Sequence, residues 1–180
     1  MLKGVIFHAV EEIVLGLYGE DTWDILLGNS GVSAAYTALG NYEEADTEAL
    51  VAVAGALLGQ SIDDPLRLIG RHLLPQRTKR LGNVTAQFLC AEELLRSVDD
   101  IIHPEVELSY SRVVLPMHKF SEIDDGILGH YVSARRLLAS TQGLIVGGGD
   151  LYGEETKIEP LGASSPTDAR FIVKVLDALS

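Results

Sequence analysis

The side chains best suited to holding a metal or a cofactor are the five histidines, at positions 8, 72, 103, 118 and 130. A neutral imidazole can donate a hydrogen bond, accept one or ligate a metal, so each of them is a candidate. His103 differs from the others in its setting. At about 100° per residue along a helix it lies at the rim of the apolar stripe that contains Ile102 and Val106. An imidazole in that position can face an apolar cavity.

The neighbours of His103 also allow less specific interpretations. Asp99 and Glu107 stand one helical turn away on either side, as they would on a solvated acidic face or in a surface site for a divalent metal. Pro104 follows directly, removes a hydrogen bond to the carbonyl of Asp100 and restricts the backbone of His103. We therefore expect the helix to be kinked or locally loosened here, which would set the direction of the imidazole.

A second pattern of side chains that could bind a ligand is Tyr131-Val132-Ser133-Ala134-Arg135. On a strand, Tyr131 and Ser133 project from one face about 6.6 Å apart, and Arg135 continues the line as the strand ends. A phenol, a hydroxyl and a guanidinium in a row suit a pair of carboxylates. Each such charge-assisted bond contributes roughly 1.5–3 kcal/mol.

The elements that must position these residues change character along the chain. In the first half, apolar residues recur at steps of three and four, and Gly19 and Gly59 are placed to end two helices. Caps are expected at Asp21, at Asp46, and at Ser61 with Asp64. The helices predicted are one ending at Gly19, a short one from Asp21 through Ile25, one from Asp46 to Leu58, one beginning near Pro65, and a long one over Ala86–Tyr110.

The second half predicts a sheet. Strands are expected over Val113–Phe120, Ile127–Ser133, Glu155–Glu159 and Ala169–Val175, with an acidic turn at Ser121–Gly126 and a helix from about Ala134 to Val146 that ends at Gly147–Gly149. The fold class is therefore α+β. A helical lobe over about residues 1–62 precedes a lobe over about 63–180, which holds a small, mostly antiparallel four-stranded sheet with a packed helix. Together they form a single domain of 180 residues.

Composition limits the classes of partner. The formal net charge of −12 argues against nucleic acid and against anionic membranes as partners. The charge indicates either good solubility alone or a protein partner with a basic patch, and net charge does not choose between these two interpretations. The apolar run Ala49–Ile62 is shorter than the roughly 20 residues of a membrane span. One cysteine excludes an internal disulfide framework and a cysteine-based zinc cluster. A cytoplasmic protein is the expectation.

The helical His103 and the Tyr-x-Ser-x-Arg pattern are more specific together than either is alone. A helical His103 followed 28 residues later by Tyr-x-Ser-x-Arg resembles the haem–nitric oxide/oxygen binding (H-NOX) family. The resemblance extends along essentially the whole chain, in the stand-alone bacterial form of the family. The other segments that carry it are Lys3–Phe7, Leu17–Gly19, Ile102–Val106, Leu115–Pro116 and Gly143–Ile145.

The resemblance implies a haem b group (iron protoporphyrin IX) between the two lobes. His103 would be the axial iron ligand, Tyr131, Ser133 and Arg135 would hold the propionates, and Pro116 would press on the macrocycle. The family function that follows is sensing of nitric oxide (NO). Binding of the gas weakens the bond between iron and His103, and the change of shape is transmitted to a histidine kinase or a cyclic-di-GMP enzyme.

Three alternatives remain open. Family members that hold O2 have a distal tyrosine, whereas Ser140 takes that position here and the other distal positions, Val10 and Leu73, are apolar; NO is therefore favoured over O2. The chain could instead be a haem-free ligand-binding or interaction module of the same fold. An enzyme is not expected, because no Gly-x-Ser-x-Gly motif is present and Gly147–Gly149 is predicted to end a helix, not to open one.

Overall fold

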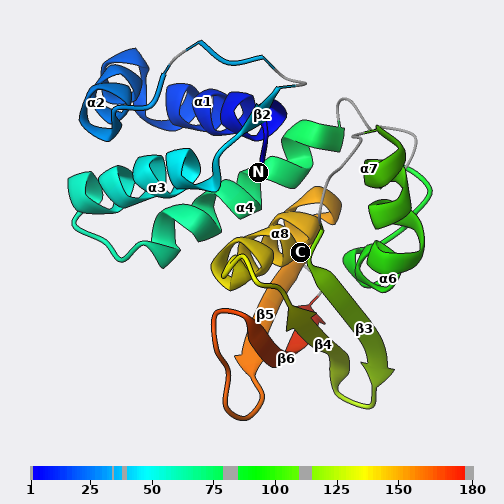
Figure 1. Ribbon diagram of the computed structural model, residues 1–180. Coiled ribbons are helices and arrows are strands. Elements are labelled where there is room, and N and C mark those ends of the chain that lie inside the picture. Colours follow the sequence, from blue (N-terminus) through cyan, green and yellow to red (C-terminus); the bar gives the residue numbers. More distant parts are fainter. Residues whose placement is uncertain (1, 34, 38–39, 79–84, 110–114, 177–180) are drawn as a thin grey trace. The chain divides into compact units, whose positions relative to one another are not determined.

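The computed structural model describes residues 2–33, 35–37, 40–78, 85–109 and 115–176. The chain divides into two compact units, Met1–Ile69 and Gly70–Ser180 (Figure 1). Each unit has its own hydrophobic core, one built by helices and the other by a sheet and the helix against it.

The first unit consists of helices and one short strand pair. It contains α1 (Gly4–Tyr18), α2 (Glu20–Ser30), α3 (Glu44–Leu58), the start of α4 (Asp63–Thr78), and the antiparallel strands β1 (Leu2–Lys3) and β2 (Asn41–Tyr42). The apolar faces of the helices meet in a core formed by Phe7, Val10, Val14, Trp23, Leu26 and Leu50. The three-and-four spacing of the apolar residues therefore predicts the buried face of α1 correctly in the middle of the helix, whereas Leu17 near its end is 48% exposed.

The glycine signals for the ends of α1 and α3 are confirmed. Gly19 follows α1 with φ 85°, and Gly59 follows α3 with φ 62°, both in the left-handed region that glycine adopts without steric cost. α2 is longer than predicted, because it continues past Ile25 to a third such glycine, Gly31. Asp21 accordingly lies inside the first turn of α2 and is not its cap.

The other predicted caps are partly confirmed. α3 begins at Glu44, so Asp46 lies within the helix and does not cap it. Ahead of α4, the carboxylate of Asp64 accepts hydrogen bonds from the main-chain N–H of Ser61 at 3.2 Å and from its hydroxyl at 2.8 Å. This is the carboxylate half of a capping box. The serine hydroxyl donates to that carboxylate, where a full box would have it accept from the backbone.

The second unit contains a four-stranded antiparallel sheet in the order β3-β4-β6-β5. Its strands are β3 (Met117–Ile123), β4 (Gly126–Val132), β5 (Glu155–Pro160) and β6 (Asp168–Leu176). The α+β fold class and the four strands are confirmed; residues 113–114 of the first predicted strand lie outside the described part of the chain. The β3–β4 turn is tighter than predicted, since Ile123 pairs with Gly126 across two residues.

One helix, α8 (Leu138–Tyr152), packs against this sheet through Ile145, which joins Ile127, Phe171 and Val173 in the core. The prediction of its ends was wrong. α8 starts at Leu138, runs through Gly147–Gly149 and ends at Gly153, where φ is 71°.

The glycines inside α8 serve packing. A Cβ on Gly147 would overlap the carbonyl oxygen of Arg71 in α4, and a Cβ on Gly70 in α4 would overlap the carbonyl oxygen of Ser140 in α8. The two helices therefore cross with their backbones nearly in contact, and only glycine fits at those two positions.

The long helix predicted over Ala86–Tyr110 is also wrong as a continuous element. The described part consists of α6 (Ala91–Arg96), the π-helical segment η1 (Val98–Ile102) and α7 (His103–Ser109); Tyr110 lies outside it. In η1 the N–H of Ile102 donates to the carbonyl of Ser97 at 3.2 Å, and that of His103 donates to Val98, both five residues back. Pro104 has no N–H to continue an α-helical ladder, so the expected loosening is present as a π-turn immediately before His103.

Among the described residues, no single helix has the length and apolar composition to cross a membrane. The helices Ala45–Leu58 and Asp63–Leu74, which are bent by 111° relative to each other, have that length and composition only when they are counted together.

Candidate functional site

His103 is the first residue of α7 and directly follows the π-turn. Its Nδ1 lies 3.0 Å from Oδ1 of Asp99, and its side chain is 17% exposed. Burial lowers the pKa of His103, while the carboxylate of Asp99 acts in the opposite direction. Because Asp99 accepts the Nδ1–H, the lone pair of Nε2 remains for an acceptor role or for a metal. The sequence prediction that Asp99 and His103 share a direction is thus confirmed.

A second histidine that we did not predict as a site residue lies beside the first. His118 in β3 is 6% exposed, and its ring centroid is 5.3 Å from that of His103. Its Nε2 lies 3.0 Å from Oγ1 of Thr141, whereas its Nδ1 has no hydrogen-bond partner in the part of the chain that the structure describes. Burial, followed by the charge of His103, lowers the pKa of His118 to about 4, so its imidazole is neutral at neutral pH.

Asp99 links the two histidines through one oxygen. Oδ1 accepts from Nδ1–H of His103 and also from the main-chain N–H of His118, at 3.3 Å. Asp99 therefore links the π-turn to β3 by a hydrogen bond, next to the two neighbouring imidazoles.

These side chains border a cavity of about 110 Å³ within the second unit. Its wall comprises His103, His118 and Thr141 together with leucine, valine, isoleucine and phenylalanine side chains from α4, α6, η1, β3 and α8. Cofactor pockets commonly have roughly 300–1,000 Å³, so this cavity accommodates only part of a large ring. An apolar wall with one half-buried imidazole whose Nδ1 is held by a carboxylate is what the iron-ligand side of a haem requires. The residues present fit that group.

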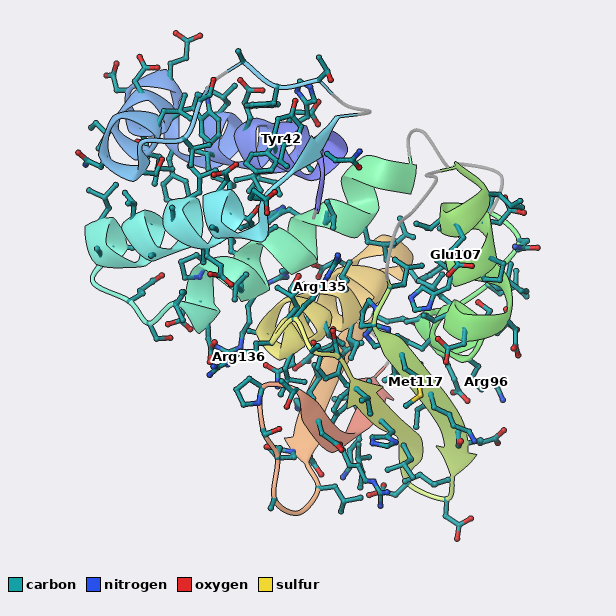
Figure 2. All side chains as sticks on the ribbon, viewed as in Figure 1. Tyr42, Arg96, Glu107, Met117, Arg135 and Arg136 are labelled. Atoms are coloured by element: carbon teal, nitrogen blue, oxygen red, sulfur yellow. The ribbon has the colours of Figure 1, made fainter. Side chains whose placement is uncertain are left out.

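The predicted propionate residues occupy the end of β4 and the loop after it. Tyr131 is fully buried, and its hydroxyl accepts the main-chain N–H of Leu137 at 2.9 Å, which leaves its own proton to donate. Ser133 lies beyond the strand, which ends at Val132, and its hydroxyl accepts the N–H of Arg135 at 3.2 Å. Figure 2 shows Arg135 on this β4–α8 connection. The three side chains thus come from one strand end and loop, not from consecutive positions on one strand face.

Pro116, the remaining predicted cofactor contact, is half-buried and directly precedes β3. Two residues later comes His118, so the same short segment delivers the proline and the second imidazole. In the structure Met117 and Lys119 are exposed, whereas His118 is buried and Phe120 is half-buried. The sequence signal for this is the period of two along a strand, which places His118 on the same face as the apolar Phe120.

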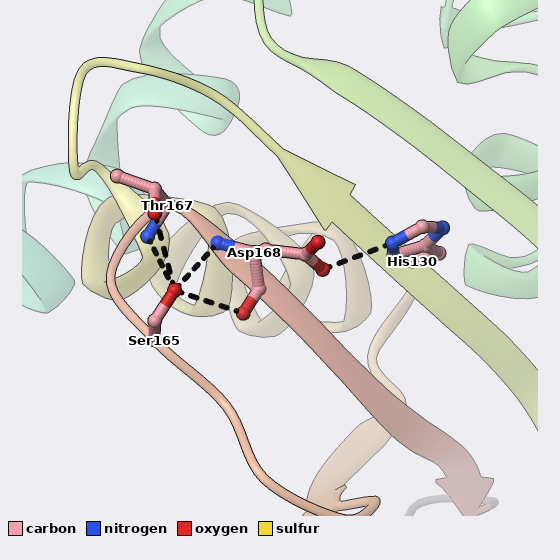
Figure 3. Close-up of polar contacts among 4 residues, drawn as sticks. All are labelled: His130, Ser165, Thr167 and Asp168. Carbon is pink, nitrogen blue, oxygen red and sulfur yellow. Dashed lines mark hydrogen bonds and ion pairs between the residues drawn. The ribbon is translucent and has the colours of Figure 1, made fainter.

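A separate polar cluster could be mistaken for a catalytic triad (Figure 3). Nε2 of His130 lies 3.0 Å from Oδ1 of Asp168, but the hydroxyl of Ser165 accepts the main-chain N–H groups of Thr167 and Asp168, at 3.3 and 3.0 Å. Ser165 is thus hydrogen-bonded to the turn before β6, whereas His130, among the described residues, bonds to Asp168 and not to Ser165. This arrangement is a turn motif, with no nucleophile activated by a base.

The chain matches a model of a known protein family and several solved structures. A model of the Haem-NO-binding (HNOB) family matches residues 3–160. The H-NOX protein of S. oneidensis, solved in the Fe(II)NO ligation state, is 24% identical with a TM-score of 0.88, and the match covers 98% of this chain and 100% of that one. The Fe(II) unliganded H-NOX protein of K. algicida is 23% identical with a TM-score of 0.87, and 99% of each chain is covered. No curated protein sequence matches.

The family match spans most of the chain, and the structural matches reproduce the whole fold. The chain therefore belongs to the Haem-NO-binding family, a family of haem-based gas sensors that includes the H-NOX proteins.

Proposed function

We propose that this protein is a nitric oxide sensor that holds haem b through His103 and signals to a separate partner protein. The observation that carries the proposal is the pair formed by His103 and Asp99 at the wall of an apolar cavity. The carboxylate fixes the tautomer of His103 so that Nε2 carries the lone pair and is available to ligate a metal. Bound haem would supply a ferrous iron with an open position for the gas.

The other predicted cofactor contacts remain part of the proposal. Tyr131 has a hydroxyl proton to donate, and Ser133 and Arg135 stand on the loop that follows, so all three can serve the propionate carboxylates. Pro116 would contact the macrocycle from the segment that leads into β3.

Nitric oxide is favoured over O2 by the side chain of Ser140. Stable O2 binding needs a hydrogen-bond donor close to the gas, and Ser140 is a short, half-buried donor where O2-binding relatives have tyrosine. Val10, a distal position by the family resemblance alone, is 6% exposed in the apolar core of the first unit. The relative from S. oneidensis was solved in the Fe(II)NO state, which supports the same ligand for this chain.

The output is proposed to be binding, with no catalytic activity of the chain itself. A partner must bind the two ligation states with different affinity, because a ligand shifts an equilibrium only by its differential affinity for the two states. A histidine kinase or a cyclic-di-GMP enzyme with a basic docking face would complement the net charge of −12.

The test is an anaerobic absorption spectrum of the ferrous haem-reconstituted protein with and without NO. We expect a Soret band that shifts on addition of NO. His103→Gly should lose haem or retain it only when free imidazole is supplied. His130→Asn is the matched control, because it removes another histidine bonded to a carboxylate at 3.0 Å, on β4. A chain that stays colourless after reconstitution, or a His103→Gly variant with an unchanged spectrum, would refute the proposal.

A further inference from the structure

Asp99, His103 and His118 form a cluster of metal-ligating side chains. One ligand atom from each lies within 4.8 Å of the others. The Asp99 Oδ1–His103 Nδ1 separation is 3.0 Å. Two ligands of one zinc ion, each about 2.0–2.2 Å from it, lie roughly 3 Å apart, so this pair already has the spacing of neighbouring ligands.

His118 supplies an independent indication that the cluster takes a ligand. Its side chain is 6% exposed, and its Nδ1 has no partner among the described residues. When Nε2–H donates to the hydroxyl of Thr141, Nδ1 carries a lone pair. Buried polar groups are almost always paired, and metal-ligating histidines typically have their other nitrogen held as Thr141 holds this one. The orphan nitrogen is explained if a cation occupies the space beside it.

We propose that the haem-free chain binds one divalent transition-metal ion of the zinc type through Asp99, His103 and His118. Two imidazoles and one carboxylate are a ligand set found in zinc and non-haem iron sites, with the remaining positions left for water. The cavity beside the two rings, about 110 Å³, has room for such water. Asp100, Glu105 and Glu107 are exposed on the same helical segment and make the local potential negative.

The ion and haem would compete for this chain because both use His103. The ion takes Nδ1, the nitrogen that faces Asp99, and the ring then carries its proton on Nε2. An iron ligand at Nε2 would require loss of that second proton, which is unfavourable near neutral pH. The site therefore belongs to the chain before haem is inserted.

The experiment is a calorimetric titration of Zn²⁺ into the full-length, tag-free and haem-free protein at neutral pH. We expect one equivalent to bind, and both His118→Ala and Asp99→Asn to weaken the affinity at least tenfold. His130→Asn is the control, because it removes a histidine–carboxylate pair of the same spacing outside the cluster, and its affinity should equal that of the unmodified chain. Stoichiometric haem added beforehand should abolish the tight site.

Absence of a one-equivalent site, or equal affinity in Asp99→Asn and the unmodified chain, would overturn the inference. His118 is buried, so circular dichroism must show that its variant is folded; if it is not, Asp99→Asn, with a side chain 37% exposed, decides. The two proposals fail separately. A Soret band without zinc binding overturns only the ion site, whereas zinc binding without haem retention overturns only the gas sensor.

Discussion

At the scale of single residues, the site depends on one carboxylate oxygen that serves two histidines. Asp99 accepts a side-chain N–H from His103 and a main-chain N–H from His118, so it orients one imidazole and fixes the strand that carries the other. Its charge favours protonation of His103, whereas burial opposes it. For His118, burial and then the charge of His103 both lower the pKa, and this difference between the two histidines has a measurable consequence.

The free energy of unfolding of the haem-free chain should fall as the pH is lowered through the range from about 6.5 to about 4. The pKa of His118 is about 4 in the folded chain against 6.5 ordinarily, because burial disfavours the charged ring. Between those values the unfolded chain binds one more proton than the folded chain, so stability present above pH 6.5 is lost on acidification. The slope is about 1.4 kcal/mol per pH unit, and the loss sums to roughly 3 kcal/mol.

Urea unfolding at several pH values checks this prediction against His118→Gln, which cannot titrate. Any difference between the two proteins above pH 7 reports packing alone and serves as the baseline. The variant should lose less stability than the unmodified chain below that point. Parallel curves for the two proteins would contradict the assignment of the slope to His118.

At the scale of elements, the π-turn before His103 follows from Pro104. This proline is the second residue of α7, where its missing N–H costs little, but it prevents an α-helical bond back to the carbonyl of Asp100. Pro104→Ala supplies the donor and should let the segment approach a regular α-helix. Amide hydrogen exchange over residues 98–109 should slow severalfold.

Pro65→Ala is the control for this prediction. Pro65 lies in the first turn of α4 and has no π-turn before it, so its replacement should leave the exchange of residues 98–109 unchanged. Faster or unaltered exchange in Pro104→Ala would show that the π-turn has another cause.

The close crossing of α4 and α8 predicts how a methyl group added at the contact would change the stability of the protein. Gly147→Ala should destabilise the protein by about 1–3 kcal/mol, because the added methyl overlaps the carbonyl oxygen of Arg71 and the backbone must move. Gly148→Ala is the matched control. Its Cβ would have only Leu94 at 3.4 Å and Leu74 at 3.8 Å as neighbours, and alanine is favoured over glycine inside a helix by about 1 kcal/mol. Chemical denaturation of the two variants checks this, and equal free energies of unfolding would refute it.

The glycines and the π-turn show which parts of the fold could be predicted from sequence. Helix ends at Gly19 and Gly59 follow from local chemistry, since each glycine has a positive φ that its own helix requires. The glycines of α8 look identical in sequence but are required by Arg71, a residue 76 positions before Gly147, so no local pattern could distinguish them. The π-turn was predicted only as a loosening, because Pro104 removes a bond without specifying how the preceding turn closes.

For the site too, contacts within one segment could be predicted from the sequence, and contacts between elements could not. His103 and Asp99 lie on one short segment, and helical spacing places them together. His118 joins them through the pairing of β3 with β4, which sets it opposite Tyr131, and through Thr141 on α8. Contacts that depend on pairing between strands and on packing across elements are not contained in the spacing along the chain.

At the scale of the whole molecule, electrostatic repulsion is spread over the surface. Acidic residues number 26 against 14 basic ones, which gives the formal net charge of −12. Exposed ion pairs link separate elements of the second unit, such as Arg71 with Asp150 at 2.6 Å and Arg96 with Glu122 at 2.8 Å. Each such exposed pair contributes only about 0–1 kcal/mol. Repulsion among the excess carboxylates therefore outweighs these attractions when salt is low.

Sodium chloride should stabilise the haem-free chain at neutral pH. Raising the ionic strength from about 0.01 M to about 0.15 M shortens the screening length from roughly 30 Å to roughly 8 Å. That removes repulsion between distant carboxylates while leaving ion pairs near 3 Å largely intact, so the free energy of unfolding should rise by on the order of 1 kcal/mol. The midpoint of urea unfolding measures the effect, because urea adds no ions.

The control is the same measurement near pH 4.7, the isoelectric point expected from the sequence. There the net charge vanishes, so the gain in stability should disappear. An equal gain at both pH values would mean that salt acts by some route other than screening, whereas a loss at neutral pH would mean that the short ion pairs outweigh the net charge.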